Sequence, residues 1–289
     1  MTIFLLVSML GLLGQPRKAT AELVLGILEQ TQCTQDPSVA VRAMFARRGQ
    51  EWVALTSREG SQGVSLPAVW TVGLHGKTLG RITTSDPGFQ TDDAWTFPRD
   101  RLLLVTPGQP EPEVGNKQRG FAGWCDPPTR RPLVVVSRPT VQDPDRWKPY
   151  RPVDALRSHL FEDFTKHAGA VSTCPADPEV PTPLAYGSRD LVFFPSYQDR
   201  SGKRLVVLGL DVHRNTCDGP PGPGFAPHSF LLGNEALYLG SNLTLVDAGD
   251  YDSDGASEVL FWYSGYNDDG YTLFYDGFRK HVDYHWNYH

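Results

Sequence analysis

One acidic segment near the C-terminus, residues 249–261, constrains the fold more than any other feature of this 289-residue chain. Three aspartates alternate in it, a glycine follows the third, and a glutamate closes the pattern. Hard cations such as Ca²⁺ need roughly six to eight oxygen ligands, and a short loop supplies them by curling around the ion. Gly255 permits that sharp reversal because it lacks a Cβ. The predicted calcium ligands are Asp250, Asp252, Asp254, the main-chain carbonyl of Ala256, and Glu258.

The segments on either side of this loop are typical of strands. Residues 243–246 precede it and residues 259–263 follow it, and both are rich in β-branched, leucine or aromatic residues. An EF-hand loop would need a bidentate glutamate at its twelfth position, where this chain has Phe261. The ion is therefore expected in a turn between two strands. The alternative is a solvated acidic turn without an ion, although four converging carboxylates repel one another unless a cation compensates them.

With these flanks, the loop resembles the calcium loop of FG-GAP and VCBS repeats, the blades of integrin-α-like β-propellers. In that family the matching carboxylates and one main-chain carbonyl hold Ca²⁺ in the hairpin between the first two strands of a blade. The resemblance covers residues 243–289 at most and implies one four-stranded, calcium-binding blade. It also implies that blade loops present a surface to a protein or glycan partner. Glu258 departs from the family pattern, in which aspartate is commoner at this position.

Short strand-like runs separated by turns recur along the rest of the chain. The 28 glycines and 24 prolines indicate many turns and little long helix. Val69–Leu74 and Leu79–Ile82, for example, flank a glycine turn of the kind that hairpins favour. Only residues 154–169 have apolar residues at helical spacing. We expect an all-β fold, a β-propeller-like array of antiparallel sheets with one short inserted helix. The alternative is a two-sheet β-sandwich.

Residues 1–21 have the pattern of a secretory signal peptide. An apolar run too short to span a bilayer is followed by Ala19-Thr20-Ala21, a small-x-small cleavage site. A membrane-tethered N-terminus and a misassigned start codon are the alternatives. Cleavage leaves residues 22–289 as one all-β domain with no membrane span and with 25 basic against 33 acidic residues. This balance favours neither nucleic acid nor an anionic membrane as a partner, and we expect a secreted or periplasmic protein.

The four cysteines are far apart and form no C-x-x-C pair. An even number of cysteines in an exported protein predicts two disulfides; the alternative is four buried free thiols in a cytosolic protein. Three pairings are open. We prefer Cys33 with Cys125 and Cys174 with Cys217, because each bridge then closes a loop within one half of the chain.

A second possible ligand set lies at the C-terminus. His281, Asp283 and His285 alternate, so on a strand they share one face. Two imidazoles and a carboxylate suit zinc or iron. The same alternation is also typical of a half-buried strand whose intervening apolar residues point inward.

Together these features favour an exported calcium-binding β-propeller-type protein, a binding or scaffold module for a protein or glycan. The alternative is a metal-assisted hydrolase that uses the C-terminal histidines. The sequence contains no G-x-S-x-G, H-E-x-x-H or G-x-x-x-x-G-K motif. We therefore assign no catalytic residue and do not favour an enzyme.

Overall fold

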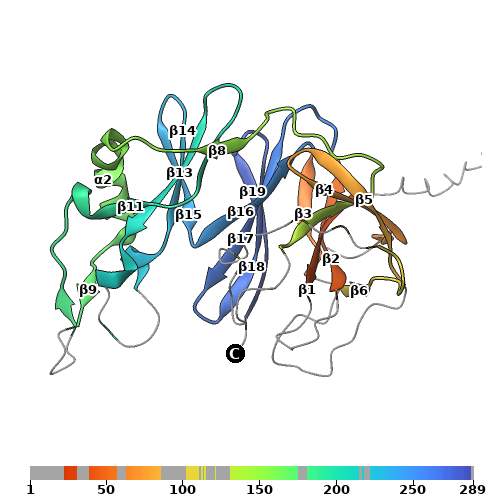
Figure 1. Ribbon diagram of the computed structural model, residues 1–289, viewed down its shortest axis with the longest axis horizontal. Helices are drawn as coiled ribbons and strands as arrows, with labels where there is room; N and C mark the ends of the chain where they lie inside the picture. Colours follow the sequence, from red (N-terminus) through yellow and green to blue (C-terminus); the bar gives the residue numbers. More distant parts are fainter. Residues whose placement is uncertain are drawn as a thin grey trace, which may run out of the picture.

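The computed structural model describes residues 23–30, 39–56, 63–85, 102–110, 112, 114, 121, 131–174, 181–214, 217 and 222–287. Within these ranges the chain is mostly β, with four antiparallel sheets and one α-helix (Figure 1). The predicted signal peptide and the predicted Cys33–Cys125 bridge lie outside the described residues. No helix in the described ranges has the length and apolar character that a membrane crossing needs.

The first sheet has seven strands and comes from the N-terminal half of the chain. Its order is β3-β2-β1-β7-β4-β5, with β6 paired to β2. The strands are β1 (Val24–Gln30), β2 (Val39–Arg48), β3 (Glu51–Ala54), β4 (Val69–Leu74), β5 (Lys77–Thr83), β6 (Leu102–Leu104) and β7 (Leu133–Val136). The hairpin of β4 and β5 was expected. The sequence pattern did not predict β1, whose apolar run begins directly after the expected cleavage site, yet β1 lies between β2 and β7 near the middle of the sheet.

The second large sheet has six strands and carries the helix. Its order is β15-β14-β13-β12-β8, with β11 paired to β13. The elements are β8 (Lys148–Tyr150), α2 (Ala155–Ala168), β11 (Leu191–Phe193), β12 (Ser196–Gln198), β13 (Arg204–Leu210), β14 (His228–Leu232) and β15 (Ala236–Ser241). Leu160 and Phe164 of α2 are buried in one cluster with Val206 and Leu208 of β13 and with Phe230. The helix therefore covers one face of this sheet, and the prediction of a single short inserted helix is confirmed for the described residues.

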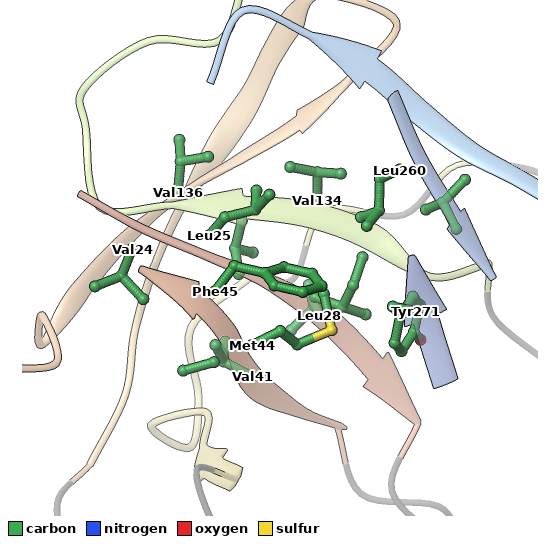
Figure 2. Packing of buried hydrophobic residues seen from close by; sticks show 14 of the residues in the cluster. Val24, Leu25, Leu28, Val41, Met44, Phe45, Val134, Val136, Leu260 and Tyr271 are labelled. Atoms are coloured by element: carbon green, nitrogen blue, oxygen red, sulfur yellow. The ribbon is translucent and has the colours of Figure 1, made fainter. Parts of the chain in front are cut away.

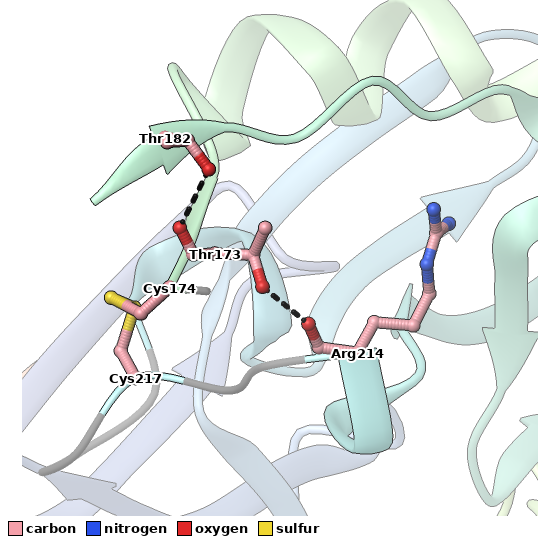
Figure 3. Close-up of a disulfide and its surroundings, with 5 residues drawn as sticks. All are labelled: Thr173, Cys174, Thr182, Arg214 and Cys217. Atoms are coloured by element: carbon pink, nitrogen blue, oxygen red, sulfur yellow. Dashed lines mark hydrogen bonds between the residues drawn. A yellow bond between two sulfur atoms is a disulfide. The ribbon is translucent and has the colours of Figure 1, made fainter. Parts of the chain in front are cut away.

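A two-stranded sheet of β9 (Ser172–Thr173) and β10 (Thr182–Pro183) adjoins the helix. The Cys174–Cys217 disulfide lies beside it, which confirms that predicted pairing (Figure 3). Thr173 strengthens the same corner, because its hydroxyl donates to the Arg214 carbonyl (3.0 Å) and its carbonyl accepts from Thr182 (3.1 Å). A bridge of this kind stabilises by about 2–4 kcal/mol, mainly by restricting the unfolded chain. It is consistent with an oxidising compartment.

The last sheet is a meander of four strands in sequence order. They are β16 (Leu243–Gly249), β17 (Glu258–Gly265), β18 (Asp268–Tyr275) and β19 (Lys280–Asn287). This confirms the four-stranded unit that the sequence predicts for the C-terminal segment. We call it the C-terminal sheet.

The C-terminal sheet lies between the other two large sheets (Figure 1). Along β17, Leu260 and Trp262 join a cluster with the first sheet, whereas Val259 and Phe261 join a cluster with the six-stranded sheet. Figure 2 shows Leu260 on the first-sheet side, among residues of β1, β2 and β7. The large sheets therefore form a face-to-face stack with more layers than a two-sheet sandwich. Among the described residues this stack is open, with no ring of sheets closed as in a complete propeller.

We predict that Phe261→Ala destabilises the protein by about 3–5 kcal/mol, because the ring is fully buried between two sheets. Tyr266→Ala, in the turn after β17, is the matched control. Its side chain is 75% exposed, so the change should stay within about 0.5 kcal/mol. Urea unfolding followed by circular dichroism measures both. Similar small effects for the two variants would contradict the burial of this face of the C-terminal sheet.

Candidate metal centre

The acidic loop occupies residues 250–257, between the end of β16 and the start of β17. The structure brings three of the predicted ligands together. Asp250, Asp252 and Asp254 each place a carboxylate oxygen within 4.8 Å of the other two. The alternate spacing therefore turns three carboxylates toward one point, as the sequence predicts.

Hydrogen bonds between side chains and main chain hold this curl. The Asp252 carboxylate accepts from the Asp254 amide (3.1 Å), and the Asp254 carboxylate accepts from the Ala256 amide (2.8 Å). Ser253 and Gly255 have φ values of 69° and 91°. Glycine reaches this left-handed region without strain, so the expected role of Gly255 in the reversal is confirmed. The ligand role of the Ala256 carbonyl stays a prediction.

Glu258 has a different position from the three aspartates. Its side chain is buried at the first residue of β17, and Oε2 accepts from the Tyr251 amide at 2.6 Å. Burial raises the pKa of Glu258 to about 9, and the negative charges of the three aspartates add to this effect. Glu258 does not belong to the group of converging oxygens. In the described structure the Glu258 side chain holds the start of the loop against β17 through the Tyr251 amide. The role of Glu258 as a calcium ligand stays a prediction.

The loop contains more negative charge than its neighbours compensate. Asp252 is nearly covered, with its side chain 4% exposed, and burial raises its pKa. Its Oδ2 receives no hydrogen bond from the described residues and lies 2.8 Å from Nε of Arg47. Asp250 Oδ1 is also buried without a hydrogen bond in the described part of the chain. Hard carboxylate oxygens without donors are the chemistry that Ca²⁺ accepts, so the residues fit this ion.

The segment 138–147 joins the first sheet to the six-stranded sheet and clamps the loop. At the start of the loop, the Asp250 amide donates to the Gln142 carbonyl (2.7 Å), and the Asp250 carbonyl accepts from the Arg138 guanidinium (3.0 Å). Gly249 permits this approach, because a Cβ there would lie 3.1 Å from the Gln142 oxygen and 2.7 Å from the Tyr251 ring. The loop is thus attached at its first residue to a segment from another part of the chain.

The end of the loop is clamped by the same segment. The Ser257 amide donates to Asp145 (3.0 Å), the Ser257 hydroxyl donates to Asp143 (2.7 Å), and that hydroxyl accepts from the Asp145 amide (3.3 Å). The sequence did not indicate these contacts. Asp143 and Asp145 lie in an irregular segment more than 100 residues away from Ser257, and no periodicity marks such a pairing.

A small pocket lies beside the loop, where the three large sheets meet. Its lining residues are His75, Asp143, Trp147, Pro149, Tyr197, Leu245, Asp247 and Ala248. Asp247 is buried on β16 and accepts from the His75 amide (2.7 Å) and from the Tyr251 hydroxyl (3.2 Å). Burial raises the pKa of Asp247 to about 7, although these two hydrogen bonds and the charge of Arg131 oppose the shift. The sequence analysis missed Asp247, a lone carboxylate in an apolar strand.

The C-terminal histidines share a face of β19, as the sequence predicts, but they do not converge. Asp283 lies between them, with Oδ2 3.8 Å from His281 Nε2 and Oδ1 4.0 Å from His285 Nε2. Strand geometry separates the two histidine Cα atoms by about 13 Å. Among the residues that the structure describes, the loop aspartates alone form a group of three or more converging ligands. The zinc or iron set suggested by His281, Asp283 and His285 is therefore not assembled in this structure.

Comparisons of the chain with models of known protein families, with curated proteins and with solved structures find no match. Its class is therefore defined by its own fold and site. It is a mostly β protein of stacked antiparallel sheets, with an acidic loop of the C-terminal sheet that is a candidate metal site and contacts the first sheet and the segment 138–147. The resemblance to FG-GAP repeats stays a prediction from the sequence.

We predict that Asp247→Asn changes how stability depends on pH. The Asp247 proton is bound more tightly in the folded protein than in the unfolded chain, because its pKa rises from 3.8 to about 7. The favourable contribution of the Asp247 carboxyl to the free energy of unfolding is thus complete below about pH 4 and is lost as the pH rises through about 7. Asparagine does not ionise; its Oδ1 can accept from the His75 amide, and its Nδ2 can donate to the Tyr251 hydroxyl oxygen. Between pH 4 and pH 8 the variant should gain up to about 4 kcal/mol relative to the wild type.

Urea unfolding at several pH values measures this difference. Asp154→Asn is the control, because that side chain is 86% exposed and should follow the wild-type curve. Parallel curves for Asp247→Asn and the wild type would contradict the predicted role of the buried carboxyl.

Proposed function

We propose that this chain is an exported calcium-binding protein whose ion stabilises a β-propeller-like array of sheets. One observation carries the proposal: Asp250, Asp252 and Asp254 converge within 4.8 Å of one another at a turn between two strands. An all-carboxylate set suits a hard cation. Ca²⁺ fits better than Mg²⁺, which demands near-ideal octahedral geometry and retains its waters.

The ion would mainly stabilise the contacts of the C-terminal sheet with neighbouring parts of the chain. The loop belongs to the C-terminal sheet, its main chain is attached to segment 138–147, and Asp252 is paired with Arg47 of the first sheet. A cation that neutralises the loop would therefore stabilise contacts that three parts of the chain share. In this proposal residues 243–287 are one calcium-binding blade, and the stacked sheets are its neighbours in the array.

The array would serve as a binding or scaffold module in the periplasm or the secreted fraction. The Cys174–Cys217 disulfide supports an oxidising compartment. The proposal of a protein or glycan partner rests on the resemblance to FG-GAP repeats. The fold alone does not define a ligand. The hydrolase alternative has less support, because the C-terminal histidines flank Asp283 from opposite sides instead of surrounding a common point.

We predict that Ca²⁺ raises the midpoint of thermal unfolding by several degrees relative to chelator. A ligand at about 100 times its dissociation constant stabilises the native state by about 2.7 kcal/mol. Asp254→Asn should remove most of this rise. The variant loses one ligand charge, while its amide oxygen can still accept from the Ala256 amide as Asp254 does.

Two controls make this measurement specific. Glu162→Gln, on the exposed side of α2, removes one negative charge outside the loop and should keep the full calcium response. Mg²⁺ at the same concentration should give a smaller rise than Ca²⁺. Identical midpoints with calcium and with chelator in the wild type would overturn the proposed function.

A further inference from the structure

Arg47 reaches from the first sheet into the acidic loop of the C-terminal sheet. It stands near the end of β2, and its Nε lies 2.8 Å from Asp252 Oδ2. The contact is largely sequestered from water, with side chains 16% and 4% exposed. Oδ1 of Asp252 already accepts from the Asp254 amide. Arg47 therefore lies against the one Asp252 oxygen that has no hydrogen bond from the described residues.

We propose that Arg47 is an internal cation that competes with calcium for Asp252 and so sets the metal affinity of the loop. This inference rests on the proposed function. Calcium binds carboxylate oxygens at about 2.3–2.6 Å, and Arg47 occupies that position on Oδ2. A divalent ion there would also be repelled by the guanidinium. Even in water, charges of +1 and +2 about 6 Å apart repel by enough to weaken binding by about a factor of ten.

The surroundings of Arg47 provide a place for it when calcium binds. Its guanidinium carbon lies 5.7 Å from the centre of the Trp52 ring and 6.0 Å from that of the Tyr275 ring. Aromatic faces attract a guanidinium without needing a carboxylate. Arg47 can therefore leave Asp252 and stay at the same junction. Trp52 is in β3 and Tyr275 is in β18, so the rearrangement falls where the first sheet meets the C-terminal sheet.

The test is a calcium titration by calorimetry, at fixed ionic strength, of the wild type and three variants. Arg47→Gln removes the competing charge and should bind Ca²⁺ at least about ten times more tightly. Arg47→Lys keeps the charge and should stay close to the wild type. Arg279→Gln is the matched control for net charge. Arg279 pairs with Asp276 outside the loop and is 77% exposed, so this variant should bind as the wild type does.

A second measurement uses the wild-type protein alone. The Arg47 Nε–H signal in a nitrogen-15 spectrum, assigned by its loss in Arg47→Lys, should shift when Ca²⁺ saturates the loop. This keeps the inference testable if Arg47→Gln does not fold.

The outcomes separate the two proposals. Calcium binding by the wild type, with equal or weaker binding by Arg47→Gln or an unmoved Arg47 signal, overturns the competition and leaves the proposed function standing. No calcium binding by the wild type or by any variant overturns both. Tighter binding by Arg47→Gln and by Arg279→Gln alike would make the effect one of net charge and would also overturn the inference.

Discussion

Because both faces of the C-terminal sheet are apolar, it must be covered by another sheet on each side. Successive residues of β17 alternate between the cluster shared with the first sheet and the cluster shared with the six-stranded sheet. Burial of this apolar surface is the dominant favourable contribution to such a stack. It fixes the order of the layers, and it places the first hairpin of the C-terminal sheet against the segment that connects the other two sheets. The position of the acidic loop is therefore a consequence of packing.

At that junction the packing brings several acidic side chains into poorly solvated positions. Glu258 and Asp247 are buried, and burial raises the pKa of both. Main-chain amides, the Tyr251 hydroxyl and Arg47 compensate part of this charge. Carboxylates that remain without donors are costly in a folded protein unless a cation or a proton neutralises them. The proposed ion would neutralise the carboxylate charge that the amides, the Tyr251 hydroxyl and Arg47 leave uncompensated.

Local signals in the sequence predicted local structure well. The strand-like residues 243–246 and 259–263, the helical spacing at residues 154–169 and the acidic pattern located the first hairpin of the C-terminal sheet, the helix and the three converging aspartates. Each of these depends on residues close together in the chain. The bond of the Glu258 side chain to the Tyr251 amide was not part of this pattern, and the role of Glu258 as a ligand stays a prediction.

Long-range partners were not predictable in the same way. The contact of Ser257 with Asp143 and the contact of Arg47 with Asp252 join positions that no periodicity relates. The apolar run at residues 259–263 indicates a strand that is covered on both faces, but it does not indicate which sheets cover it. The order of the sheets depends on which apolar faces match, and composition does not encode such a match.

The order of the layers differs from the order in which the chain is made. The first sheet and the six-stranded sheet precede the C-terminal sheet in the sequence, yet the C-terminal sheet separates them in space. Until the last strands are synthesised, both earlier sheets lack the C-terminal sheet that covers an apolar face of each in the described structure. A nascent chain of this design is therefore prone to association until β16–β19 are made, and chaperones that shield apolar surface would matter most in that interval.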